Sequence, residues 1–144
     1  CNTLKPSPLT TKSLVFAIIA IIGSSVFFSA NAQTKTATPK VYAVINKADW
    51  CKTCQANDVR VMNEVMPACK NLKVKFVAND LTNEASIEKS AAELKKNKVY
   101  NSVKETKSTG FILLVDAKTK KIIKQISVKK PSEEIIKEIT AAQS

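Results

Sequence analysis

The chain has 144 residues, enough for one domain, and 23 basic against 12 acidic residues give it a net charge of +11. It contains no histidine, which excludes Ser-His-Asp and Cys-His catalysis and any His-ligated metal site. The lysines are scattered and do not alternate with aromatic residues, so the composition favours a lysine-rich solvated surface over nucleic-acid binding.

Residues 1–32 have the pattern of a targeting segment. Two lysines precede an apolar run at residues 14–28, and an A-x-A motif follows, ending at Ala32. This pattern predicts a cleavable secretory signal peptide, so we expect a periplasmic or otherwise extracytoplasmic protein without stable membrane insertion once processed. The run is shorter than the roughly 20 residues that span a bilayer, and an uncleaved anchor is the alternative.

A polar stretch at residues 33–40 predicts a linker, and the domain is expected to occupy residues 41–144. The domain opens with an almost continuous apolar run at residues 41–46, VYAVIN, typical of a strand buried on both faces.

Export would place the cysteines of the domain in an oxidising compartment. A cysteine pair there is either structural or catalytic, and a catalytic pair requires a donor that keeps it reduced.

A helix is predicted to follow, from about residue 51 to residue 71. Pro67 removes one helical hydrogen bond and should kink or divide this helix. Spacings of three and four residues predict one buried apolar stripe along it, formed by Val59, Met62, Met66 and Cys69. Within that stripe Cys69 is most simply a small buried apolar side chain. The alternative is that it serves as a third redox thiol or forms an intermolecular disulfide bridge.

The second half of the domain is predicted to begin with an edge strand at residues 72–78, where apolar residues alternate with lysines. Two helices should follow, at residues 83–96, with Asn83 as N-cap, and at residues 99–107. We interpret this lysine-rich stretch as two solvated helices; a role in specificity is the alternative.

A continuous apolar run at residues 111–115 predicts another buried strand, and the alternating residues 121–128 predict its hairpin partner. The last helix should begin at Pro131. The order is therefore β-α-β-α-β-β-α, an α/β fold with a central four-stranded mixed sheet flanked by helices. The first strand–helix–strand crossover implies parallel pairing, and the two continuous apolar strands should lie at the centre of the sheet.

The junction between the first strand and the first helix carries the motif Trp50-Cys51-Lys52-Thr53-Cys54. A bare CxxC is a weak signal, but a Trp-Cys-x-x-Cys motif at a strand-to-helix junction is more specific. In this motif and in its predicted element order the chain resembles the thioredoxin family. The resemblance covers residues 41–142 as a pattern and residues 50–54 as a motif.

The position of Cys51 at the start of a helix favours its thiolate, because free backbone N–H groups and the helix dipole stabilise negative charge there. Lys52 should act in the same direction. Cys54 lies one helical turn further on, within reach of Cys51. The resemblance implies that Cys51 is the nucleophile, that Cys54 resolves the mixed disulfide, and that Trp50 and Thr53 support the site, with Trp50 shaping a docking surface.

The sequence departs from the thioredoxin pattern at two places near this motif. Family members often bury an acidic residue six positions before the first cysteine, where this chain has Ile45. The family also places a cis-proline before the strand predicted at residues 111–115, where this chain has none. Thr109 or Gly110 could supply the backbone that pairs with substrate there; a plain loop is the alternative.

These residues predict an extracytoplasmic thiol–disulfide oxidoreductase, more a reductase than an oxidase, that needs no cofactor. Its partners would be protein disulfide or dithiol clients and an electron donor, which could be a membrane protein. Three cysteines in the domain, without histidine, do not make a structural zinc site. The alternative is a non-catalytic binding module or a Cu(I) carrier, since thiolates suit Cu(I).

Overall fold

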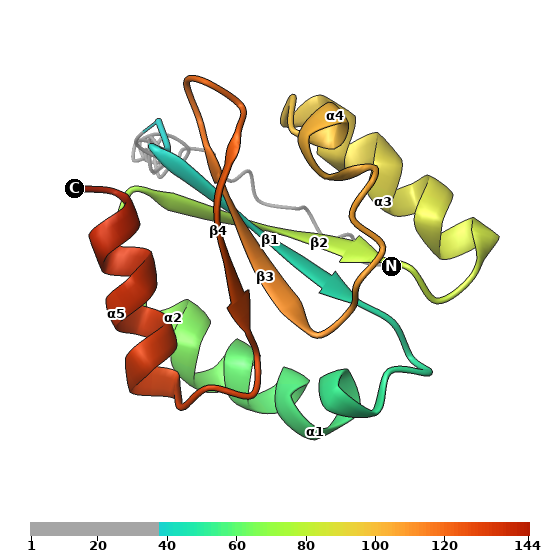
Figure 1. Cartoon of the computed structure of the whole chain (residues 1–144), viewed down its shortest axis with the longest axis horizontal. Helices are drawn as coiled ribbons and strands as arrows, with labels where there is room; N and C mark the ends of the chain where they lie inside the picture. Colours follow the sequence, from blue (N-terminus) through green and yellow to red (C-terminus); the bar gives the residue numbers. More distant parts are fainter. Residues whose placement is uncertain (1–37) are drawn as a thin grey trace, which may run out of the picture. The chain divides into compact units, whose positions relative to one another are not determined.

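The computed structural model describes residues 38–144, and the predicted signal peptide and most of the predicted linker lie outside them. These residues form one four-stranded mixed sheet with helices on both faces (Figure 1). The predicted α/β class and element order are confirmed. No helix between residues 38 and 144 is long and apolar enough to cross a membrane.

The strands lie in the order β2-β1-β3-β4, with bounds β1 Val41–Lys47, β2 Val74–Asp80, β3 Phe111–Asp116 and β4 Ile122–Ser127. Strand β1 pairs in parallel with β2 and antiparallel with β3, and β3 and β4 form an antiparallel hairpin. The two continuous apolar strands therefore occupy the centre, as predicted, because only central strands are covered on both faces and have both edges paired.

The helices cover the two faces of the sheet in separate groups (Figure 1). One face carries α1 Lys52–Arg60, the π-helical turn η2 Val61–Val65, α2 Met66–Ala68 and α5 Ser132–Ala142. The other face carries α3 Glu84–Lys96 and α4 Tyr100–Val103. Each face has its own apolar core, and alternate residues of β1 and β3 contribute to one core or the other.

The buried stripe of the first helical run differs from the predicted one. Val59 and Met62 are 68% and 60% exposed, and Met66 is half-buried. The side chains that face the sheet are instead Cys54, Val61, Val65 and Cys69. Both sets have helical spacing, but the true stripe also passes over the polar Asp58, so its periodicity is hidden in the sequence.

The predicted effect of Pro67 is confirmed, one turn before the proline itself. The backbone N–H of Met66 donates to the carbonyl of Val61, five residues back, so η2 is wider than an α-helical turn. Proline has no N–H, and its ring clashes with the carbonyl four residues earlier, here that of Asn63. The wider turn accommodates this clash, and the helical run continues to Ala68.

Several predicted boundaries differ from the structure; the first helical run, for example, ends at Ala68 and not at residue 71. Strand β2 starts at Val74, two residues late, because a turn closed by the Leu72 N–H on the Cys69 carbonyl precedes it. Helix α4 ends at Val103, far short of residue 107, because the following carbonyls bond to a side chain of β1. Pro131 is the N-cap of α5, with extended ψ of 148°, and so lies just outside the helix.

Candidate functional site

Cys51 is the N-cap residue of α1. Its backbone is extended, with φ −83° and ψ 107°, and its Sγ accepts a hydrogen bond from the Cys54 N–H at 3.2 Å. A serine or aspartate oxygen usually makes this capping bond. Here the sulfur takes its place, so the helix N-terminus directs N–H groups at the Cys51 thiol, as the sequence predicted.

The two sulfurs of the motif lie together below the surface. Cys54 Sγ is 2.6 Å from Cys51 Sγ, and the Cys54 thiol donates to it. Cys51 is 8% exposed and Cys54 only 1% exposed, so solvent reaches the first sulfur and hardly the second. A reagent or disulfide arriving from outside would therefore meet Cys51 first.

The surroundings shift the pKa values of the two thiols in opposite directions. Burial acts to raise the pKa of Cys51, but hydrogen bonds from the side chains of Cys54 and Thr109 and from the backbone of Cys54 and Thr53 outweigh it. The net pKa of Cys51 is lowered. Burial, the hydrogen bond to Cys51 and nearby negative charge raise the pKa of Cys54 to about 11. Such a split assigns the thiolate to Cys51.

The loop before β3 packs directly against this pair. Gly110 has a φ of +83°, and a Cβ added to it would lie 3.1 Å from Thr53 Cγ2 and 3.8 Å from Cys51 Sγ. No peptide bond in residues 38–144 is cis. The structure thus brings the loop at Gly110 close to Thr53 and Cys51.

Thr109 and Gly110 of this loop differ in their free backbone groups. The Gly110 N–H donates to Asn46 O at 2.8 Å, and its carbonyl accepts from the Val128 N–H at 3.0 Å, so both groups are used. Thr109, in contrast, has neither its N–H nor its carbonyl bonded to any residue between 38 and 144. The backbone groups that a substrate could pair with are therefore those of Thr109.

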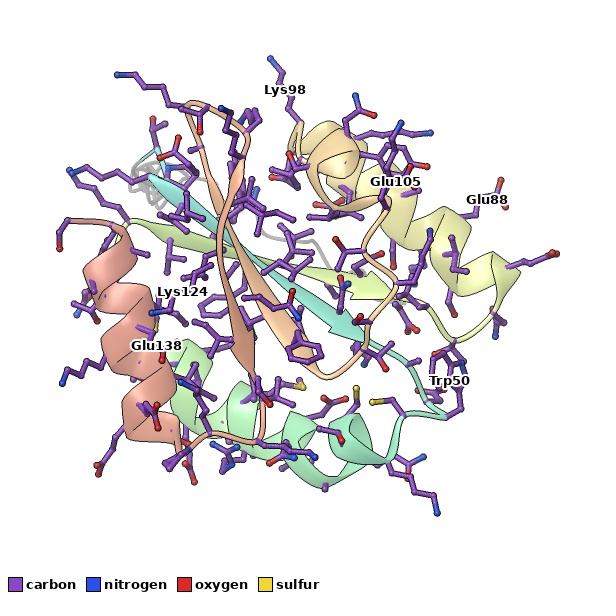
Figure 2. All side chains as sticks on the ribbon, in the orientation of Figure 1. Trp50, Glu88, Lys98, Glu105, Lys124 and Glu138 are labelled. Carbon is purple, nitrogen blue, oxygen red and sulfur yellow. The ribbon has the colours of Figure 1, made fainter. Side chains whose placement is uncertain are left out.

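The remaining motif residues have distinct positions. Trp50 is 60% exposed, and its Nε1–H donates to Thr82 O at 3.3 Å, which holds the ring beside the loop after β2 (Figure 2). Thr53 lies between Cys51 and Gly110. Lys52 is exposed and is not among the groups that lower the pKa of Cys51. Its expected contribution to the Cys51 thiolate stays a prediction.

An acidic residue near Cys54 was missed by the sequence prediction. Asp58 lies one helical turn after Cys54 on the same side of α1, and its negative charge helps to raise the pKa of Cys54. Burial raises the pKa of Asp58 itself, and Lys47 Nζ lies 3.9 Å from its carboxylate. The i, i+4 spacing from Cys54 was the available signal, but the acid was sought on the strand, where Ile45 packs into the core.

Asn46 and Asn79 are the other polar residues that the prediction missed. They stand in register on β1 and β2, both buried, and the Asn79 amide donates to Asn46 Oδ1 at 2.9 Å. An asparagine that ends an apolar strand was the only sequence signal.

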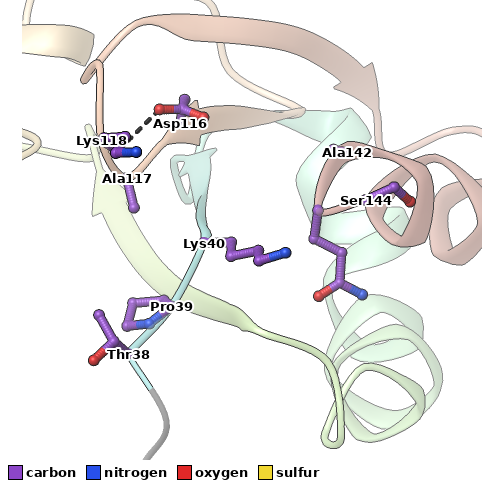
Figure 3. A pocket seen from close by; sticks show the side chains of 9 residues that line it. Thr38, Pro39, Lys40, Asp116, Ala117, Lys118, Ala142 and Ser144 are labelled. Carbon is purple, nitrogen blue, oxygen red and sulfur yellow. Dashed lines mark hydrogen bonds between the residues drawn. The ribbon is translucent and has the colours of Figure 1, made fainter.

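A hollow of about 440 Å³ lies at the other end of β1, away from the cysteines (Figure 3). Its lining includes Lys40, Asp116 and Lys118, but no cysteine. The Asp116 carboxylate is already bonded to the N–H groups of Lys118 and Thr119 in the β3–β4 turn. This carboxylate is therefore already satisfied by the turn.

Residues 38–144 contain no cluster of three or more cysteine, aspartate or glutamate side chains that could hold a metal ion. The two sulfurs of Cys51 and Cys54 are the only close thiol pair among them. Met62 cannot complete a site with them, since it follows Cys54 by eight residues, about 12 Å along a helix. A soft metal would find two thiolates and no third sulfur ligand here.

No protein-family model matches the sequence, and no match is found among curated proteins or solved structures. The function proposed below therefore rests on the residues of the chain itself.

Proposed function

We propose that this protein is an extracytoplasmic thiol–disulfide oxidoreductase of thioredoxin-like fold that reduces disulfides of client proteins through Cys51 and Cys54. One observation carries the proposal. A helix N-terminus holds the Cys51 sulfur, whose pKa is lowered, 2.6 Å from the less exposed Cys54 sulfur, whose pKa is raised to about 11. The proposed export rests on the sequence of residues 1–32.

In the proposed cycle the Cys51 thiolate attacks one sulfur of a client disulfide. The client S–S bond breaks, its other sulfur leaves as a thiolate that takes a proton from water, and a Cys51–client mixed disulfide forms. Cys54 then attacks Cys51 Sγ and its proton passes to the departing client sulfur, which leaves as the second client thiol. The client gains two electrons, and the protein is left with a Cys51–Cys54 disulfide that a dithiol donor must reduce.

The loop at Thr109 would serve as the docking edge in this cycle. Its unbonded N–H and carbonyl could pair with an extended client backbone, while Gly110, without a side chain, lets the loop approach Cys51. The exposed Trp50 ring would flank the opposite side. Client specificity through the docking edge would then depend on shape and backbone pairing near the disulfide.

The deciding experiment is a redox titration of the full chain in dithiothreitol and glutathione buffers, read by mass spectrometry after alkylation. A reversible two-electron couple near about −270 mV would support a reductase, and one near about −120 mV would make the protein an oxidant. A pair that forms no reversible disulfide would overturn the enzyme. Tight Cu(I) binding by the two thiols without turnover would instead support a metal carrier.

A further inference from the structure

Asn46 is fully buried at the carboxyl end of β1, with an exposed fraction of 0%. Its Nδ2 group donates to Thr106 O at 2.9 Å and to Ser108 O at 3.2 Å, and its Oδ1 accepts from Asn79. Both amide hydrogens are thus used on the loop that leads to β3. The same residue also accepts the Gly110 N–H on its backbone carbonyl at 2.8 Å.

These three bonds lie on either side of Thr109, the residue proposed as the docking edge. They fix the chain at Thr106, Ser108 and Gly110, which leaves Thr109 held from both sides while its own backbone groups stay unbonded. Residues 106–109 have no regular secondary structure, and no proline restricts them. The conformation of Thr109 therefore depends on bonds to neighbouring elements. Asn46 makes three of them, and the Val128 N–H makes a fourth, to the Gly110 carbonyl.

Core packing alone does not require an amide at this position. Buried polar groups destabilise a fold unless every hydrogen bond is made, and the residues of β1 and β3 around Asn46 on this face are apolar. Val44 fills the equivalent position two residues earlier on the same strand. The amide contributes what valine cannot, two donors directed at loop carbonyls.

Resting on the function proposed above, we propose that Asn46 is a positioning residue. Its amide, oriented by Asn79, holds the loop at Thr106 and Ser108 and so keeps the Thr109–Gly110 segment beside Cys51. Asn46 does not touch the reacting atoms.

The test measures the rate at which iodoacetamide alkylates Cys51 as a function of pH, in the full chain carrying Cys54→Ser and read by peptide mass spectrometry. Asn46→Leu keeps the size of the side chain and removes both donors. If Asn46 holds this segment in place, this variant should raise the pKa of Cys51 and slow alkylation at pH 7 about three- to tenfold. Thr109→Val, which removes the hydroxyl alone, should slow it comparably.

The two variants are then combined. If Asn46 acts through Thr109, Asn46→Leu should have no further effect in the Thr109→Val background. An equal slowing in both backgrounds, or none in either, would overturn the proposal. A matched control is Val115→Ala, which opens a cavity on the same sheet face at the far end of β3 and should leave the Cys51 profile unchanged.

If Asn46→Leu does not fold, Asn46→Ser replaces it, since one short hydroxyl cannot serve two carbonyls. The same pKa rise, smaller in size, is then expected, and an unchanged profile in this folded variant would contradict the positioning role of Asn46. Alkylation requires no disulfide cycling. Failure of the redox titration would therefore leave this test intact, and failure of this test would leave the redox proposal standing.

Discussion

Cys51 and Cys69 occupy the two ends of the same helical run and have opposite chemistry. Cys51 caps the N-terminus, where four hydrogen bonds from neighbouring groups lower its pKa. Cys69 is the C-cap residue after α2, buried in the core between the sheet and α5, and burial alone raises its pKa. The described residues provide Cys69 with no thiol partner.

The difference shows that hydrogen-bond donors at a helix N-terminus can outweigh the effect of burial on a thiol pKa, which acts alone on Cys69. Both sulfurs are buried, but only the N-terminus offers N–H donors that stabilise a thiolate, whereas the C-terminus presents carbonyl oxygens that oppose one. Cys69 therefore has the properties of a small apolar side chain, as the sequence predicted. The interpretation was right even though its stripe partners Val59 and Met62 proved exposed.

The largest expected effect distinguishes the roles of Cys51 and Cys69. Cys51→Ser should reduce the turnover of a model protein disulfide, with dithiothreitol as donor, by at least about 10³-fold, because no nucleophile is left. Cys69→Ala is the matched control and should stay within about twofold of the unchanged protein while losing about 1 kcal/mol of unfolding free energy. Loss of turnover in Cys69→Ala would assign Cys69 a redox role.

The next effect concerns the glycine that faces Cys51. Gly110→Ala places a methyl group at φ +83° and 3.1 Å from Thr53 Cγ2, so we expect unfolding free energy to fall by about 1–3 kcal/mol. Chemical denaturation measures this loss, and Cys51 alkylation should slow because the loop is displaced. Lys98→Gly is the reverse substitution, which introduces a glycine at a φ of 60° far from the site. It serves as the control and should be neutral or slightly stabilising.

A smaller effect tests the charge beside Cys54. Asp58→Asn removes a negative charge that raises the pKa of Cys54, so in a Cys51→Ser background Cys54 should be alkylated about two- to fivefold faster at pH 8. Glu88→Gln changes an exposed acid on α3 instead and should have no effect (Figure 2). Slower alkylation in Asp58→Asn would mean that Asp58 promotes loss of the Cys54 proton.

The smallest effect is a pH dependence of stability in the reduced protein. The pKa of Cys54 in the folded state is about 11, above its ordinary value of 9.0, and that of Cys69 is raised as well. The folded state then binds more protons than the unfolded chain above pH 9, so stability should fall as pH rises from 9 towards 11. Denaturation at several pH values measures the slope, and Cys69→Ala should reduce it. A flat profile would mean that neither thiol is kept neutral by burial.

Much of the fold could be predicted because hydrophobic pattern and strand position are coupled. The run at residues 111–115 is apolar at every position and that at residues 41–46 at all but the last, which only a strand covered on both faces tolerates, so their central place followed. Asn83 was correctly predicted as the N-cap of α3, since its side chain accepts the Ser86 N–H. The buried face of the helix after Cys51 was harder to predict, because the predicted and the observed apolar stripes both have helical spacing.

The sequence by itself determined the α/β order, the central strands and the placement of Cys51 at a helix start, because these depend on local pattern and on neighbours within a few residues. Tertiary structure alone decided the rest of the site. The Asn46 amide reaches a loop sixty residues away, and Asp58 is directed at Cys54 only because the helix turns that face to the sheet. The Asn46 bonds join segments about sixty residues apart, a separation that carries no periodic signal, so only the folded packing reveals them.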